Sequence, residues 1–364
     1  MKPRIVLKVG SNLLTNRDGT LNVTRMSSFV DQIAELREMK YDVIFVSSGA
    51  VASGRGELKA RKSLDSVQQR QLYSAVGQVK LMNLYYDLFR EKGIKVGQVL
   101  TMKENFSTRQ EYLNQRNCMT VMLENGVLPI VNENDTLSIT ELMFTDNDEL
   151  SGLIASMLDA KLLILLTNVD GIYRNVGEGA ASSVVRRIGL DDDFEQYISS
   201  VHSSAGRGGM FTKCNTARKM AAEGIRTCIA NGETPHIICD LVTRPEECLF
   251  TEFLPCKKNL SSVKKWIAHS EGFIKGVVTV NNRAAMKLLD EQEAVSLLPV
   301  GIEQVVGDFK EGDIIRIVQA DGSEIARGRA AYGADEARLH LGEHNQKPLV
   351  HYDYLFHLKG HDSL

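Results

Sequence analysis

The segment RIVLKVGSN, residues 4–12, decides the predicted fold of this chain. Its first six residues are mostly apolar and enclose one lysine, and a glycine and a serine follow soon after. A continuous apolar run is typical of a strand that is buried on both faces, as in a parallel sheet. Similar short runs recur along the chain: DVIFVSS (42–48), VGQVL (96–100), VLPIV (127–131), KLLILLT (161–167), IRTCIA (225–230) and HIICD (236–240).

Segments with helical spacing of apolar residues separate these runs. Residues 24–40 place their apolar side chains on one helical face, and residues 150–158 repeat the same pattern. Strands that alternate with helices predict a mainly parallel open sheet with helices on both faces. We therefore predict one α/β domain over residues 1–255.

The pattern changes after residue 255. Residues 256–275 are polar and basic, and we interpret them as a linker with one short helix. From residue 276 the predicted elements are short strands, and Asp321-Gly322 is a strong hairpin-turn signal. Residues 276–364 are therefore predicted to form a separate, small β-rich domain.

The composition is that of an ordinary globular protein. Of the 364 residues, 43% are hydrophobic and 24% charged, and the net charge of −3 gives no reason to expect nucleic acid or an anionic membrane as partner. No long apolar run or signal-peptide cleavage region is recognised, so we expect a cytoplasmic protein. The six cysteines form no C-x-x-C pair, so no zinc or disulfide framework is expected, and no metal ligands are assigned.

Polar residues at the carboxyl ends of the predicted strands are the candidates for chemistry, because ligands bind there in open α/β sheets. Lys8 lies inside an apolar strand, which is costly unless its charge is paired. The alternative is a lysine on an edge strand that reaches solvent. Ser48 and Gly49 open a helix that could bind an anion, although ordinary capping by Ser48 also explains them.

Acidic residues gather in two places farther along the chain. The run NENDT, residues 132–136, ends the fourth strand, and Asp146, Asp148 and Glu149 precede a helix. Acids suit the positive end of a helix dipole, so capping alone could account for this second group. A site at this edge of the sheet remains the other explanation.

The glycine-rich stretch SAGRGGMFTK, residues 204–213, matches neither the P-loop nor the dinucleotide-binding pattern. Thr212 is the predicted N-cap of the helix that follows, which places Lys213 in its first turn. A lysine there fits a shared anion, while a flexible surface loop is the alternative. The hydrolase and zinc-protease motifs are absent from the sequence.

Several motifs occur in order along the first 255 residues: IVLKVGSNLLT, IFVSSGAVASG, LPIVNENDT, TDNDELSGLIASML, LLTNVDGIY and GRGGMFTK. Together they resemble the amino-acid kinase family, and most closely its glutamate 5-kinases. The C-terminal region contains SLLPVGI and GDFKEGDIIRI. With these motifs, residues 276–355 resemble the PUA domain that many bacterial members carry.

The resemblance implies roles for matching residues. Lys8 and Lys213 would hold the transferring phosphoryl group, and Asp148 would orient both lysines. The substrate contacts would be Ser48, Asp135 and Asn147. The ATP contacts would be Lys8, Thr167, Asn168, Arg207, Gly208, Gly209, Met210, Phe211, Thr212 and Lys213. The chain departs from the family where Asn168 replaces a common Asp and where Arg207 and Phe211 replace smaller residues.

The implied reaction is the phosphorylation of the γ-carboxylate of L-glutamate by ATP, the first step of proline biosynthesis. That carboxylate has a pKa of about 4.3, so it is ionised at neutral pH and needs no general base. The resemblance also implies Mg²⁺ bound with ATP, proline as a feedback inhibitor, a downstream glutamyl-phosphate reductase and a homo-oligomer.

Two alternatives remain at this point. One is an amino-acid kinase that acts on a different carboxylate or phosphate substrate. The other is an RNA-associated protein, because PUA domains occur in RNA-modifying enzymes. Residues 276–364 contain nine Lys and Arg against fourteen Asp and Glu, whereas a nucleic-acid surface would be basic. We therefore do not expect RNA binding as the main function.

Overall fold

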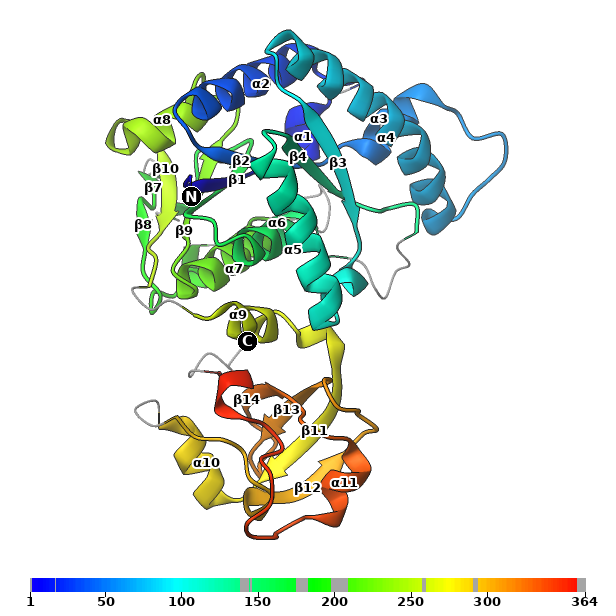
Figure 1. Ribbon diagram of the computed structural model, residues 1–364. Coiled ribbons are helices and arrows are strands. Elements are labelled where there is room, and N and C mark those ends of the chain that lie inside the picture. Colours follow the sequence, from blue (N-terminus) through cyan, green and yellow to red (C-terminus); the bar gives the residue numbers. More distant parts are fainter. Residues whose placement is uncertain are drawn as a thin grey trace. The chain divides into compact units, whose positions relative to one another are not determined.

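The structure, a computed structural model, describes residues 2–16, 18–137, 144, 146–174, 183–197, 209–256, 260–290 and 294–358. The chain separates into two compact units (Figure 1). The first unit comprises Met1–Lys103 and Asn114–Asn259, and the second, C-terminal unit comprises Glu104–Leu113 and Leu260–Leu364.

An eight-stranded sheet, counted over the described residues, forms the centre of the first unit in the order β3-β4-β2-β1-β5-β9-β10-β8. All of its strand pairs are parallel except β9 with β10, so the predicted mainly parallel sheet is confirmed. The strands are β1 (Arg4–Val9), β2 (Asp42–Ser47), β3 (Val96–Thr101), β4 (Leu128–Glu133), β5 (Leu162–Thr167), β8 (Arg187–Ile188), β9 (Arg226–Asn231) and β10 (Phe250–Phe253), with β6 (Tyr173–Arg174) and β7 (Ser183–Val184) in a separate pair.

Helices cover both faces of this sheet (Figure 1). Side chains alternate along β1, so Leu7 packs in the core under α2 and α8 while Lys8 points to α6 on the other face. The helices are α1 (Ser11–Leu14), α2 (Val23–Glu38), α3 (Ala50–Glu57), α4 (Ser66–Glu91), α5 (Arg109–Glu124), α6 (Asn147–Met157), α7 (Met210–Ala222) and α8 (Ile237–Thr243).

One predicted strand is wrong. The run HIICD, residues 236–240, begins helix α8, and the strand near it is β10, which we had not predicted. Ile237, Ile238 and Leu241 are buried against α2, a spacing that one helical face provides. A short apolar run has no periodicity of its own, so it cannot distinguish a buried strand from a buried helix.

The C-terminal unit holds a five-stranded sheet in the order β12-β11-β13-β14-β15. The predicted turn at Asp321-Gly322 joins β13 to β14, and Gly322 adopts the positive φ of +86° that this turn requires. Its elements are β11 (Ile274–Val280), β12 (Ile302–Val306), β13 (Ile314–Val318), β14 (Glu324–Arg329), β15 (Leu355–His357), α9 (Ser262–Ala268), α10 (Asn282–Leu289) and α11 (Ala334–Leu339).

The predicted linker, residues 256–275, contains helix α9, and Trp266 of that helix is buried. The indole of Trp266 donates a hydrogen bond of 3.0 Å to the carbonyl of Phe106 within the same unit. The domain limits named from the sequence stay a prediction. All six cysteines carry free thiols, and no helix in the described ranges combines the length and apolarity needed to span a membrane.

Candidate active site

Lys8 lies in the middle of the sheet, not at its edge. Strand β1 pairs with β2 on one side and with β5 on the other, so the edge-strand alternative is wrong. The Lys8 side chain is 5% exposed, and its Nζ lies 2.6 Å from Oδ1 of Asp148. The buried charge is therefore paired, as burial requires.

Helix α6 brings Asp148 to Lys8. Asp146 is the N-cap of this helix, and its Oδ1 accepts hydrogen bonds from the backbone N–H groups of Asp148 and Glu149 at 2.8 and 3.2 Å. The Asp148 side chain is fully buried and bonds lysines instead of the helix end. Capping therefore explains Asp146, whereas Asp148 belongs to a charged site.

Lys213 reaches the same carboxylate from helix α7. Its Nζ lies 2.8 Å from Oδ2 of Asp148, and its side chain is 9% exposed. The predicted N-cap, Thr212, is wrong, because helix α7 begins at Met210 and its N-cap is Gly209, three residues before Thr212. Thr212 instead donates from its hydroxyl to Oδ2 of Asp146 at 2.7 Å, which ties the first turn of α7 to that of α6.

We call Lys8, Asp148 and Lys213 the lysine cluster. Its two ammonium groups and one carboxylate leave an excess of one positive charge. Burial lowers the pKa of Lys8, and the charge of Asp148 opposes that effect. Burial alone would raise the pKa of Asp148, but the two lysines outweigh it and hold that pKa below its usual value. The cluster can therefore neutralise an anion placed against it.

Asp146 beside the cluster behaves differently. Burial and the neighbouring charge of Asp148 raise its pKa, while the Thr212 hydroxyl and the lysines act in the opposite direction. Its carboxylate is engaged by the backbone of α6 and by α7 at once. Asp146 therefore joins the first turn of α6 to the first turn of α7.

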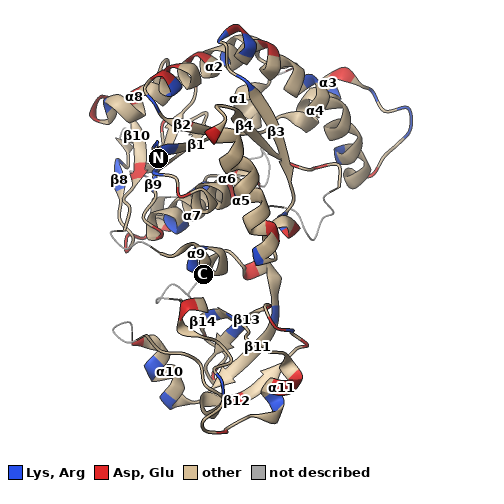
Figure 2. Cartoon of the chain, viewed as in Figure 1, with Lys and Arg blue, Asp and Glu red and all other residues tan. Residues whose placement is uncertain are grey.

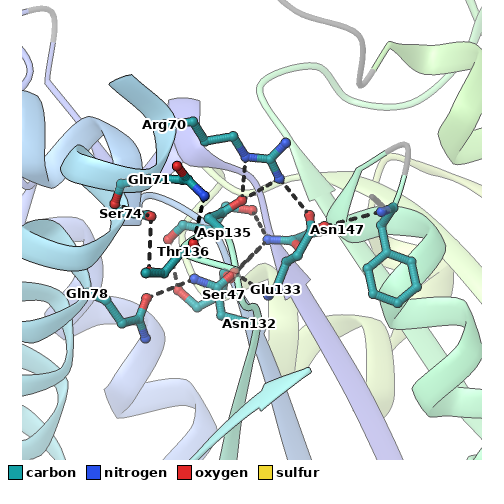
Figure 3. A network of polar contacts seen from close by, with 12 residues as sticks. Ser47, Arg70, Gln71, Ser74, Gln78, Asn132, Glu133, Asp135, Thr136 and Asn147 are labelled. Carbon is teal, nitrogen blue, oxygen red and sulfur yellow. Dashed lines mark hydrogen bonds and ion pairs between the residues drawn. The ribbon is translucent and has the colours of Figure 1, made fainter. Parts of the chain in front are cut away.

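A second polar network lies at the ends of β2 and β4 (Figure 3). The amide nitrogen of Asn147 lies 3.1 Å from the carbonyl of Ser47, 2.9 Å from Oγ of Ser48 and 2.9 Å from Oδ1 of Asn132. Ser48 is not a helix cap, because α3 begins after Gly49, whose φ is +100°. Two predicted substrate residues, Ser48 and Asn147, are thus in direct contact.

The third, Asp135, is held by a residue that the sequence analysis missed. Arg70 of α4 donates from Nε to Oδ1 of Asp135 at 2.7 Å, and its Nη2 also contacts that oxygen. The same Nη2 lies 3.0 Å from Oε2 of Glu133. We call Arg70, Glu133 and Asp135 the arginine cluster; its excess charge is −1.

Helix α4 presents a polar face to this network (Figure 3). Gln71 donates to the carbonyl of Thr136 at 3.1 Å, the hydroxyls of Ser74 and Thr136 lie 3.4 Å apart, and Gln78 accepts from Asn132 at 3.0 Å. Polar residues three and four apart normally mark the solvent side of a helix. The sequence showed only this spacing of polar residues around Arg70. It did not show that they lie opposite the acidic end of β4.

The predicted nucleotide residues fall into two groups. Thr167 and Asn168 end strand β5, with the Thr167 hydroxyl 3.4 Å from Oδ1 of Asn168. Gly209, Met210 and Phe211 open helix α7, and the exposed Phe211 ring lies 6.3 Å from the ring of Phe194. Within the described residues no hydrogen bond joins the two groups. Arg207 and Gly208 lie outside the described residues.

Comparison with known proteins identifies the family. Residues 3–231 match the amino acid kinase family, and residues 276–351 match the PUA domain. The chain belongs to the amino acid kinase family. It is 59% identical to a glutamate 5-kinase from Bacteroides thetaiotaomicron, over 97% of this chain and 98% of that protein. It is 46% identical to a glutamate 5-kinase from Chlorobaculum tepidum, over 97% of each chain.

Within the amino acid kinase family, the chain groups with the glutamate 5-kinases. The fold also matches a solved structure, the carbamate kinase from Giardia lamblia bound to AMP-PNP. The TM-score is 0.51 at 16% identity, and the match covers 70% of this chain and 99% of that protein. At that identity the likeness shows a common fold. The predicted α/β kinase fold and the β-rich PUA domain are confirmed.

Proposed function

We propose that this chain transfers the γ-phosphoryl group of ATP to the γ-carboxylate of L-glutamate, forming L-glutamyl 5-phosphate, the first step of proline biosynthesis. Relatives named glutamate 5-kinase that match almost the whole chain support the substrate. The structural observation that carries the proposal is the lysine cluster, with two buried ammonium groups on one buried carboxylate.

The chemistry requires charge neutralisation more than proton transfer. The attacking γ-carboxylate is already ionised at neutral pH, so no general base is needed. Its approach to an anionic phosphate is opposed by repulsion, and negative charge spreads over the phosphoryl oxygens as the bond to the leaving group breaks. Lys8 and Lys213 would meet that charge, and Asp148 would keep their ammonium groups apart and aimed.

The polar network would bind the other end of glutamate. Asp135 would accept the α-ammonium group, because its carboxylate is the most exposed acid of the arginine cluster. Ser48 contacts Asn147, which is the first residue of helix α6, and Asp148 is the second residue of that helix. We therefore expect the substrate contacts to lie beside the residues proposed for phosphoryl transfer.

ATP would lie along the end of β5 and the start of α7, with Thr167, Asn168 and the segment from Arg207 to Lys213 as contacts. Both oxygens of Asp148 face ammonium groups, and Asp146 is engaged by two helices, so these carboxylates fit no metal cage of their own. Mg²⁺ would therefore be held mainly by the nucleotide phosphates, where it would neutralise part of their charge.

The product would be an acyl phosphate, which hydrolyses readily. A downstream glutamyl-phosphate reductase would consume it, and proline would inhibit the enzyme at or near the glutamate site. We also expect a homo-oligomer.

A coupled ADP-release assay tests the function. The purified chain would receive ATP and Mg²⁺ with L-glutamate, L-aspartate or N-acetylglutamate, each with and without proline. Of the three compounds, we expect only L-glutamate to give rapid ADP release. We expect proline to inhibit that release. Faster turnover of L-aspartate or N-acetylglutamate would contradict the assigned substrate.

The RNA-associated alternative has little support in the second unit. Lys and Arg are interspersed with Asp and Glu there, and helix α11 carries both signs (Figure 2). A filter-binding measurement at physiological salt with a structured RNA would detect a real nucleic-acid surface. Submicromolar, salt-sensitive binding would revive this alternative.

A further inference from the structure

Arg70 binds only one oxygen of Asp135. Its Nε lies 2.7 Å from Oδ1, and its Nη2 contacts the same oxygen. Oδ2 accepts no hydrogen bond from any residue that the structure describes. The Asp135 side chain is 14% exposed, so it is not sealed from solvent. One oxygen is therefore held in place while the other is left to accept a donor from outside the chain.

Glu133 fixes the orientation of Arg70. Its Oε2 accepts from Nη2 of Arg70 at 3.0 Å, and its Oε1 accepts from the backbone N–H of Phe144 at 3.2 Å. The Glu133 side chain is buried. The planar guanidinium fork thus spans a buried acid and a partly exposed acid, which suits arginine better than the single ammonium of lysine.

We propose that Arg70 is a positioning residue for substrate binding: it orients Asp135 so that Oδ2 receives the α-ammonium group of the amino-acid substrate. This inference rests on the proposed function. It assigns selection for a free amino group to a pair of residues, one on α4 and one after β4, and gives Arg70 no contact with substrate.

Charge supports this arrangement. Burial raises the pKa of Asp135, and the charge and hydrogen bond of Arg70 oppose that rise. The other acid in the cluster, Glu133, pairs with the same guanidinium group as Asp135. Without Arg70 the pKa of Asp135 would rise further, so a larger share of it would be protonated and unable to attract an ammonium group.

The test compares two substrates in matched variants. Arg70→Met removes the charge and the fork, Arg70→Lys keeps the charge, and Arg90→Met removes an exposed arginine from the same helix, where it pairs with Asp87. L-glutamate is compared with glutarate, which keeps both carboxylates and lacks only the amino group. Glutarate is measured as a substrate or, where turnover is too slow, as a competitive inhibitor against L-glutamate.

In Arg70→Met we expect kcat/KM for L-glutamate to fall about 10- to 100-fold, mostly through KM, since a charge-assisted hydrogen bond is no longer oriented. KM for ATP and the apparent affinity for glutarate should change by less than about threefold. Arg70→Lys should recover part of the kcat/KM for L-glutamate that Arg70→Met loses. Arg90→Met should have the same kcat/KM as the wild type.

The pH profile provides a second readout. Asp135 must be ionised to attract an ammonium group, so binding weakens as the pH falls through its pKa. The acid limb of kcat/KM for L-glutamate should therefore lie at higher pH in Arg70→Met than in the wild type. The carboxylates of the substrate titrate identically with both proteins, so the difference reports the protein.

If Arg70→Met weakened the apparent affinity for glutarate as much as it lowered kcat/KM for L-glutamate, the inference would be overturned. Arg70 would then bind a carboxylate itself or only support the fold. An unshifted acid limb would overturn it as well. Absence of glutamate-dependent ADP release by the wild type would instead overturn the proposed function, and this inference with it. The two failures are therefore distinguishable.

Discussion

The lysine cluster and the arginine cluster lie at the same end of the kinase sheet and carry opposite excess charge. The first has two cations around one carboxylate, and its side chains are at most 9% exposed. The second has one cation between two carboxylates, and its arginine is 23% exposed. Their signs match the two groups that the proposed reaction must hold, an anionic phosphoryl group and a cationic ammonium group.

The difference in burial matches a difference in task. A buried charge acts through a low effective dielectric, so it interacts strongly with charge that develops during the reaction. A charge near solvent interacts more weakly and can exchange its partners as a substrate arrives. We therefore expect substitutions in the lysine cluster to change stability and kcat, and substitutions in the arginine cluster to change KM.

The largest effect should come from Asp148→Asn, which leaves two buried ammonium groups without their anion. Breaking a buried pair typically costs about 3–5 kcal/mol of unfolding free energy. Urea denaturation would measure it. The matched control is Asp87→Asn, which breaks an exposed ion pair with Arg90 and should cost less than about 1 kcal/mol. Similar values for the two variants would contradict the structural importance of the cluster.

Lys8→Met and Lys213→Met should each lower kcat by about 100- to 1000-fold, because each removes one preorganised cation from the transition state. Stopped assays with saturating L-glutamate and ATP would measure the effect, and circular dichroism would check the fold. Near-normal kcat in a folded variant would remove that lysine from the phosphoryl-transfer site.

Asp135→Asn should raise KM for L-glutamate about 10- to 100-fold and leave KM for ATP within about twofold, since it removes the charge proposed to meet the ammonium group. Steady-state kinetics with each substrate varied in turn would separate the two constants. A parallel rise in both would indicate that Asp135 supports the site as a whole, and the contrast between the clusters would fail.

The smallest effect should come from Glu133→Gln, which keeps the shape of the side chain that orients Arg70 and removes its charge. We expect KM for L-glutamate to rise about 2- to 10-fold with kcat nearly unchanged, because the amide oxygen of Gln can still accept from Arg70 although the charge of the pair is lost. A large fall in kcat would show that the arginine cluster also acts in the chemical step.

Local sequence patterns were sufficient for much of the fold and part of the candidate site. Continuous apolar runs predicted a mainly parallel sheet, because a strand that is buried on both faces has apolar side chains on both faces. A lysine within such a run, Lys8, had to be paired or lie at an edge. The motif resemblance indicated the family and pointed to Asp148 and Lys213. In the structure, Asp148 contacts both Lys8 and Lys213.

Only the tertiary structure decided which of the alternatives held. It placed Lys8 on a central strand, made Asp146 the cap and Asp148 the buried counter-ion, and turned the apolar run at Ile237 into a helix. It also brought Arg70 to Asp135, 65 residues away in the chain. A sequence records which charges exist, but whether a charge is buried and which partner it meets depends on contacts between distant segments, so those assignments had to come from the fold.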